Sequence, residues 1–431
     1  MKLNRKVFFR IHSWIGIKMS ILFFIVCSSG TLATLSHEMD WLFIPEIRAS
    51  YQEELADRNT IVANIKEAYP TGRVTFWAAS NESYLCDIVS VKVNKQQLRV
   101  FVNQYTGEVQ GHVKITFQRF FRDLHYYLFI PFQVGHFTVL MFGFMLFIST
   151  VTALLFYKKW YKKLFDLKRG KGKVVLFRSL HRLVGVWSIP FTILFSATGI
   201  WYFVERTDLG DVSKTANPRN PKIEMITMDS TAFANLAFTI DYNKIIAIAK
   251  KEIPNLKVKN IRIPRKKTRP IYVDGVSDIA LVRDRANRVW IHPTTFEIVG
   301  SQKAKDVNTV TWLNDLADPL HFGYWGGLTT KIIWFFGGSA ISGLVLTGIW
   351  ISLKRKIKNT KKAKAQKLGV WKYINWIVVI TMFYHMYNKL ITRYQVSTQA
   401  LIVITLGWTI LGLISWYIFV YQMKKSIVKQ N

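Results

Sequence analysis

Long apolar segments alternate with polar ones along this chain of 431 residues. A helix needs about 20 apolar residues to cross roughly 30 Å of hydrocarbon. Six segments have that character, and each predicts a transmembrane helix: residues 14–35, 132–157, 183–204, 332–353, 371–391 and 400–421. Lys372 and Lys389 shorten the apolar part of the fifth segment, although a lysine at the end of a span can extend its ammonium group to the interface. The first segment is too long for the apolar part of a signal peptide, so we interpret residues 1–35 as a short N-terminus and an anchor.

Two long polar segments, residues 36–131 and 205–331, separate these spans. Their patterns are typical of small α+β modules, with one helix each and several alternating strands. We expect the helices at 61–69 and 242–253, and the strands at 74–77, 84–93, 98–102, 260–263, 279–283 and 289–291. The predicted fold class is therefore a mainly α integral membrane protein, a six-helix transmembrane bundle with two small periplasmic α+β modules.

The charge distribution predicts the orientation of the chain in the membrane. Half of the residues are hydrophobic, yet 59 Lys and Arg outnumber 26 Asp and Glu, a net charge of +33. Of the basic residues, 26 fall in four segments that contain one acid, Asp166: residues 1–10, 158–182, 354–372 and 424–431. Because Lys and Arg collect in cytoplasmic segments, we assign the loops 158–182 and 354–370, the tail 422–431 and both termini to the cytoplasm. The charge then indicates contact with anionic lipid headgroups, and nucleic acid is not needed to explain it.

The chain contains an internal repeat at its first and third predicted spans. Residues 9–16 (FRIHSWIG) resemble residues 178–185 (RSLHRLVG). In both copies a histidine, His12 or His181, is followed by glycine at positions +4 and +18, namely Gly16, Gly30, Gly185 and Gly199. In a straight helix the +18 glycine would lie on the same face as its histidine, about 27 Å along the axis.

The two polar modules repeat as well. Residues 100–109 (VFVNQYTGEV) resemble residues 289–298 (VWIHPTTFEI), and a Leu-His pair, ending in His125 or His321, precedes the second and fourth spans. The repeating unit is thus span, module, Leu-His, span. Because both copies begin and end on the cytoplasmic side, they are predicted to be parallel repeats related by an axis along the membrane normal.

These motifs resemble those of the PepSY-associated transmembrane proteins, a group that includes bacterial inner-membrane siderophore reductases. The resemblance lies in the His-x-x-x-Gly opening, the glycine at the end of the first helix, the strand and turn at 100–109, and Leu-His-Phe-Gly-x-x-Gly-Gly at 320–327. It covers about residues 5–355 and leaves the last helical pair outside. It implies a location in the bacterial inner membrane and haem in the membrane domain, for which we expect two b-type haems.

Six histidines are the candidate axial ligands of haem iron, because ligating residues within a bilayer are costly and usually functional. His12 and His181 begin equivalent helices near the cytoplasmic surface, so that one imidazole can approach an iron from each side. His125 and His321 lie at the far surface. His136 and His385 lie about 6 Å inside it at 1.5 Å per residue and form a second plausible pair. Two imidazoles leave no vacant iron site, which favours electron transfer over oxygen chemistry.

Plainer interpretations stay open for most of these residues. An interfacial histidine can simply bond water or a headgroup, and we assign His37 that role. His112 and His292 fall in strands or turns, where a structural role is expected. Arg10 and Arg182 can bind haem propionates through paired donors, or they are ordinary residues of cytoplasmic loops. The repeated glycines suit helix packing and porphyrin clearance equally well.

The sequence contains no strand-linked G-x-G-x-x-G, no Walker lysine motif and no nucleophile elbow. Electrons would therefore come from a cytosolic reductase or a quinol. The leading hypothesis is an oxidoreductase that passes electrons across the membrane to a periplasmic Fe(III)-siderophore or other ferric chelate; its catalytic residues are unknown. The alternatives are a siderophore permease, disfavoured because no broken helix with a buried carboxylate is evident, and a haem-free scaffold or regulatory protein.

Overall fold

The structure is a computed structural model that describes residues 4–80, 82–94, 96–359 and 370–423. Most of the predicted loop 354–370 and nearly all of the predicted tail 422–431 lie outside these residues. The chain forms two compact units. The helical unit comprises residues 1–35, 120–203 and 326–431, and the sheet unit comprises residues 36–119 and 204–325.

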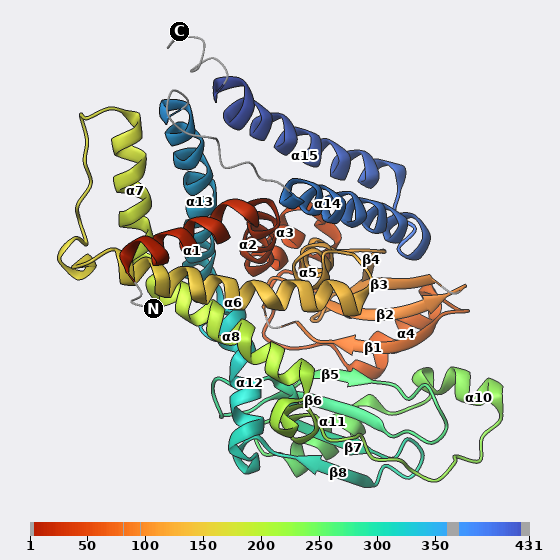
Figure 1. Cartoon of the computed structure of the whole chain (residues 1–431). Helices are drawn as coiled ribbons and strands as arrows, with labels where there is room; N and C mark the ends of the chain where they lie inside the picture. The colour runs from red at the N-terminus through yellow and green to blue at the C-terminus, as the bar shows by residue number, and fades with distance from the viewer. Residues whose placement is uncertain (1–3, 81, 95, 360–369, 424–431) are drawn as a thin grey trace. The chain divides into compact units, whose positions relative to one another are not determined.

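Three helices among the described residues are long and apolar enough to cross a membrane: α6 (Phe132–Phe156), α13 (Gly327–Asn359, of which Gly327–Arg355 is the apolar part) and α15 (Thr398–Trp416, continued to Tyr421 by the π-helical turn η8) (Figure 1). Two further pairs of helices meet the same condition only when each pair is counted as one span. The chain is therefore a membrane protein with three to five such spans in its described part.

The first and third predicted spans are each broken into two helices. α1 (Arg5–Lys18) and α2 (Ser20–Thr34) meet at 74°, and α7 (Lys173–Trp187) and α8 (Ile189–Thr207) meet at 60°. The prediction of straight helices, with His and the +18 glycine on one face, is therefore wrong. Pro190 explains the second break, since proline lacks an N–H and clashes with the carbonyl four residues earlier. The breaks fall at Met19 and Ser188, each seven residues after its histidine.

The fifth predicted span, residues 371–391, corresponds to α14 (Val370–Asn388), which ends in the π-helical turn η7 (Lys389–Arg393). Within the described residues, α14 does not reach the apolar character of α6, α13 and α15. The count of six spans therefore stays a prediction. Asn375 of α14 donates a hydrogen bond of 2.7 Å to the carbonyl of Lys18, at the break between α1 and α2.

The described residues of the sheet unit form one antiparallel sheet of eight strands in the order β4-β3-β2-β1-β5-β6-β7-β8 (Figure 1). The strands are β1 (Arg73–Ala78), β2 (Asp87–Val93), β3 (Gln96–Val102), β4 (Val109–Val113), β5 (Lys257–Arg262), β6 (Ile271–Val276), β7 (Asn287–Ile291) and β8 (Ile298–Gln302). The two modules predicted from the sequence are thus halves of one sheet, joined where β1 pairs with β5. The pairing needs residues that lie more than 180 positions apart, which no local pattern can reveal.

Two helices of the sheet unit follow the prediction closely, α4 (Arg58–Ala68) and α11 (Tyr242–Glu252). The other helices of this unit, and those that border it, are α3 (Ser36–Phe43), η1 (Pro45–Ile47), α5 (Phe117–Tyr127), η3 (Leu209–Asp211), α9 (Val212–Ala216), α10 (Ser230–Asn235), η4 (Leu236–Phe238), η5 (Asp284–Ala286), η6 (Ala304–Asp306) and α12 (Thr309–Phe322). A short helix, η2 (Trp160–Lys162), lies in the predicted loop 158–182.

The strand predicted over residues 279–283 is wrong, because the chain has no regular strand there and β6 takes that place in the sheet. β6 contains Asp274 and Gly275, which disfavour a strand in isolation. The fold accommodates both residues. Asn260 donates to the Asp274 carboxylate at 2.6 Å, and a Cβ at Gly275 would lie 2.1 Å from the Lys257 carbonyl oxygen, so the backbones approach closely there.

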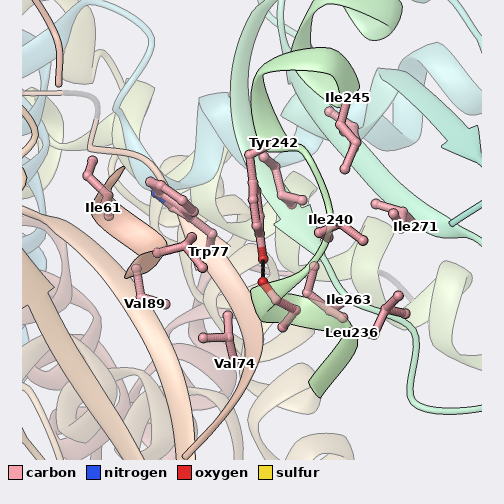
Figure 2. Packing of buried hydrophobic residues seen from close by; sticks show 14 of the residues in the cluster. Ile61, Val74, Trp77, Val89, Leu236, Ile240, Tyr242, Ile245, Ile263 and Ile271 are labelled. Carbon is pink, nitrogen blue, oxygen red and sulfur yellow. Dashed lines mark hydrogen bonds between the residues drawn. The ribbon is translucent and has the colours of Figure 1, made fainter. Parts of the chain in front are cut away.

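The core of the sheet unit is continuous across both halves of the sheet (Figure 2). Trp77 of β1 and Tyr242 of α11 pack with ring centroids 5.6 Å apart, and Ile61 of α4 is fully buried beside them. The Tyr242 hydroxyl satisfies its hydrogen bond internally by donating to the Ala237 carbonyl at 2.9 Å. Burying each large apolar side chain contributes about 1.5–3 kcal/mol, so the shared core binds the two halves into one folding unit.

Candidate functional site

His12 of α1 and His181 of α7 lie side by side in the helical unit. Their ring centroids are 6.4 Å apart and their planes cross at 78°. Two imidazoles that bind one metal ion from opposite sides, each through a bond of about 2 Å, have ring centroids roughly 6 Å apart. The structure thus brings together the two histidines that the repeat made equivalent, at a separation suited to a shared ion.

The hydrogen bonds of these histidines define which ring nitrogen is available. The Nδ1 of His12 lies 3.0 Å from the carbonyl oxygen of Ser149 and 3.1 Å from the Ser149 hydroxyl. The carbonyl can only accept, so donation to it places the ring proton on Nδ1. The Nδ1 of His181 lies 2.9 Å from the Thr347 hydroxyl, whose own proton is donated to the Gly343 carbonyl at 2.8 Å. Metal-binding histidines commonly donate their second ring N–H in this way. In the neutral ring the lone pair then lies on Nε2.

Two further observations fit a porphyrin at this pair. A Cβ added at Gly16 would meet no atom within 4 Å, and one at Gly185 would meet only Leu344 at 3.9 Å, so there is space one turn beyond each histidine. Arg182, next to His181, has a buried Nε with no hydrogen-bond partner within the described residues. Arg10 is exposed.

The His125 ring of α5 packs against α2, at Val26 and Gly30. Its Nδ1 lies 2.9 Å from the carbonyl oxygen of Val26, so this nitrogen also carries a proton. A Cβ at Gly30 would lie 2.7 Å from the imidazole Cε1 of His125, so only glycine leaves room for the ring. The equivalent Gly199 has a different role, because its Cβ position is 3.3 Å from the Cα of Gly143 on α6, where two helices meet. The repeated glycines thus serve different contacts in the two copies.

His136 is almost fully buried, with 3% of its surface exposed, near the start of α6. Its ring stacks on Phe132 with centroids 5.2 Å apart, packs against Tyr126 at 4.2 Å, and places Nδ1 3.1 Å from the Tyr126 carbonyl oxygen. His385, its predicted partner, lies on α14 with its ring edge-on to Tyr384. The pairing of His136 with His385 stays a prediction.

The remaining histidines belong to the sheet unit. His321 lies near the end of α12, and an ion pair joins this helix to η5, with the Nε of Arg285 3.0 Å from Asp315. Burial raises the pKa of the Asp315 carboxyl, while the guanidinium of Arg285 lowers it. His37 lies on α3. His112 bonds the Tyr69 hydroxyl, and His292 accepts hydrogen bonds from the backbone of Thr294 and Thr295. The last two have the structural roles expected of them.

Sequence reasoning missed the residues that orient the candidate ligands, Ser149 and Thr347. They lie 137 and 166 positions from His12 and His181, so only helix packing brings them into contact. Each stands on the second span of the same repeat as its histidine. This equivalence was the one signal in the sequence that could have pointed to Ser149 and Thr347, because the repeat predicted similar surroundings for the two imidazoles.

A bundle of apolar helices with candidate metal-ligating histidines, joined to a duplicated α+β sheet, defines the chain as a multi-span membrane protein. The family model described as the PepSY-associated TM region matches residues 9–355, and the chain belongs to that family. No curated protein matches the chain. The matched region ends within α13, so α14 and α15 lie outside it.

Proposed function

We propose that this membrane protein holds haem between paired histidines and passes electrons to a ferric chelate, such as a ferric siderophore, in the periplasm. The observation that carries the proposal is the 6.4 Å separation of the His12 and His181 rings, each with its Nδ1 proton donated to an oxygen acceptor. The nearby open space beside Gly16 and Gly185 adds support. In this proposal the protein lies in the bacterial inner membrane with both termini in the cytoplasm.

A bound haem would supply reversible one-electron transfer, while burial and axial ligands set its potential. The protein's part is to hold and orient it. His12 and His181 would provide Nε2 to the iron, and the acceptors Ser149 and Thr347 fix the plane of each ring. The unpartnered Nε of Arg182 suits a propionate. His125 and His136 are ligand candidates for a second, outer haem, with His321 and His385 as further candidates.

Reduction would release the metal from a chelate of hard oxygen donors, since Fe(II) is a softer and less highly charged ion than Fe(III). The electron donor would be a cytosolic reductase or a quinol, because the sequence carries no nucleotide-binding motif. The basic cytoplasmic segments would contact anionic lipid headgroups, and nucleic acid has no role in the proposal.

The direct test is electron transfer by the purified full-length protein. Protein reduced with dithionite and freed of excess reductant is mixed anaerobically with a ferric siderophore, and haem absorption is followed in a stopped-flow spectrometer. The expected result is rapid reoxidation with formation of one Fe(II) per haem. A gallium siderophore is the control, because Ga(III) has the same charge but is not reduced. Haem that stays reduced in the presence of every ferric chelate would overturn the reductase proposal.

A permease is the second candidate, because the structure contains the broken helices that the sequence did not reveal. At the break between α1 and α2, the Lys18 carbonyl accepts from Asn375, as backbone groups at broken helices of transporters often bind polar partners. Within the described residues of the two broken pairs the one acidic residue is Glu205, near the end of α8 and away from the break at Ser188. Its carboxylate accepts hydrogen bonds from Asn217 and Asn314. Uptake of labelled siderophore into proteoliposomes without any reductant would favour the permease, and a colourless protein with no uptake would favour a scaffold.

A further inference from the structure

The segment that follows α14 contacts the helix that carries His125. The Tyr394 hydroxyl donates a hydrogen bond of 2.6 Å to the carboxylate of Asp123 on α5. The ammonium of Lys389, in the π-helical turn η7, lies 4.0 Å from the ring centroid of Tyr127 on the same helix. Leu390, between them, is completely buried. The segment is therefore joined to α5 by a hydrogen bond and a cation–π contact.

The positions of these contacts on α5 are specific. Asp123 and Tyr127 are four residues apart and so lie on one face of the helix. His125 lies midway between them, two residues from each, and therefore projects from the opposite side. That opposite side meets α2, where the His125 ring fits against Gly30 and bonds the Val26 carbonyl. α5 is thus held from both sides, with α2 on the histidine side and η7 with Tyr394 on the other.

We infer that residues 389–394 form a clamp that positions His125, with Tyr394 and Lys389 as its positioning residues. The clamp comes from the part of the chain beyond residue 355, outside the region matched by the family, so it gives the C-terminal helices a function in this protein. A π-helical turn suits this role, because such turns are rare and occur often at functional sites. A role of the clamp in electron transfer rests on the proposed function. Its positioning of His125 does not, and can be tested without haem.

The chain offers a matched control on α14, the helix that precedes the clamp. The hydroxyl of Tyr387 forms a hydrogen bond of 2.8 Å with Thr405 of α15 and not with α5. Tyr394→Phe and Tyr387→Phe therefore each remove one tyrosine hydroxyl and one hydrogen bond, but only the first lies in the clamp. Asp123→Asn is the conservative variant, because its amide oxygen can still accept from Tyr394. Lys389→Gln removes the cation over Tyr127 and tests the clamp independently if Tyr394→Phe fails to fold.

The haem-free experiment treats each full-length variant with diethyl pyrocarbonate and follows modification of individual histidines by mass spectrometry. In Tyr394→Phe and Lys389→Gln, His125 should react several-fold faster than in the wild type, while His12 in the same sample is unchanged. Tyr387→Phe and Asp123→Asn should match the wild type. Equal His125 rates in Tyr394→Phe, Lys389→Gln and Tyr387→Phe would overturn the clamp.

The same variants are then loaded with haem and titrated electrochemically. Tyr394→Phe should shift the midpoint potential of one haem and leave the other unchanged, whereas Tyr387→Phe shifts neither. A wild type that binds no haem would defeat the proposed function, yet the modification rates would still decide whether the clamp exists. A wild type that binds haem, with Tyr394→Phe identical to it in both measurements, would defeat the clamp alone.

Discussion

Trp77 of β1 pairs directly with Ile261 of β5 at the centre of the eight-stranded sheet. The ladder continues outward from this pair in matching steps, through Val89 to Val100 on one side and through Val273 to Val289 on the other. Residues 100–109 and 289–298 are the two segments that resemble each other in sequence, so the repeat is confirmed in the sheet. Trp77 and Ile261 are equivalent residues that face each other, and a local two-fold relation passes between them.

The two-fold relation makes Asn59 and Asn243 equivalent residues, each two positions after the capping aspartate of its helix. Asn59 donates to Asp241 at 2.9 Å, and Asn243 donates to Asp57, so the helix-capping carboxylates of α4 and α11 exchange partners. We expect Asn243→Ala to destabilise the protein by about 1 kcal/mol. Asn59→Ala should lower the melting temperature further, because the Asn59 side chain also accepts a hydrogen bond of 2.8 Å from the Tyr242 backbone N–H. Circular dichroism measures both changes.

The double variant should lose about as much stability as the two single variants together, since the two exchanged hydrogen bonds have different donors and acceptors. Asn235→Ala, at the end of α10, serves as the control for a change of the same kind elsewhere in the unit. A decrease in melting temperature that is as large in Asn243→Ala as in Asn59→Ala would contradict this expectation.

The stability of the sheet unit should depend on the protonation of Asp274. Burial raises the pKa of its carboxyl to about 6 from an ordinary value of 3.8, although Asn260 donates a hydrogen bond to it. A raised pKa means that protonation favours the folded state, so this stability is present below pH 3.8 and is lost as the pH rises through about 6.

Asp274→Asn removes that titration while keeping an oxygen acceptor for Asn260. Relative to the wild type, the variant should become more stable between pH 4 and 7, by up to about 3 kcal/mol. Thermal unfolding across this range provides the check, and parallel pH profiles for the two proteins would contradict the assignment.

Gly30 should be required for the His125 ring to pack against α2. An added methyl group would lie 2.7 Å from Cε1 and 2.9 Å from Nδ1 of the ring, so Gly30→Ala should displace the imidazole and break its bond to Val26. Crowding of this kind costs about 1–3 kcal/mol. Gly407→Ala on α15, where the Cβ position meets no atom within 4 Å, is the matched control. We expect faster chemical modification of His125 only in Gly30→Ala. Equal rates in both variants would show that the His125 ring does not depend on the space at Gly30.

Thr347 should tune the site at His181. Thr347→Val keeps the shape of the side chain but removes the oxygen that accepts from Nδ1. If His181 is an axial ligand, loss of this acceptor should weaken haem binding by roughly 10-fold to 100-fold. Thr409→Val on α15 removes a hydroxyl that bonds only its own helix and should leave affinity unchanged. Haem titration of apoprotein measures both, and equal affinities would argue against ligation by His181.

The sequence was informative where structure follows local periodicity or the internal repeat. Alternating residues located β1, β2, β3, β5 and β7, and the apolar segments located α6 and α15. The repeat also singled out His12 and His181 as an equivalent pair, and the structure brings these two rings together. Apolar spacing and turn residues are visible within a short stretch of sequence, and the duplication is visible when two such stretches are compared. These signals can therefore be interpreted without tertiary information.

Contacts between distant segments account for what was missed. The break at Met19 lies within the first predicted span, and the carbonyl of Lys18 beside it accepts a hydrogen bond from Asn375, 357 positions away. β6 tolerates Asp274 because Asn260 on the neighbouring strand pairs with it. The acceptors Ser149 and Thr347 are likewise supplied by another helix. In each case a polar group is stable only because a remote partner compensates it.

The most direct test of the account is the haem content of the full-length protein purified from cells supplied with haem precursor. We predict a Soret band, dithionite-sensitive α and β bands, and stoichiometric iron in the wild type. His12→Ala and His181→Ala should each lose the same single haem, while His112→Ala, a surface residue bonded to Tyr69, loses none. A wild-type protein without stoichiometric iron, or full haem content in both His12→Ala and His181→Ala, would contradict the account.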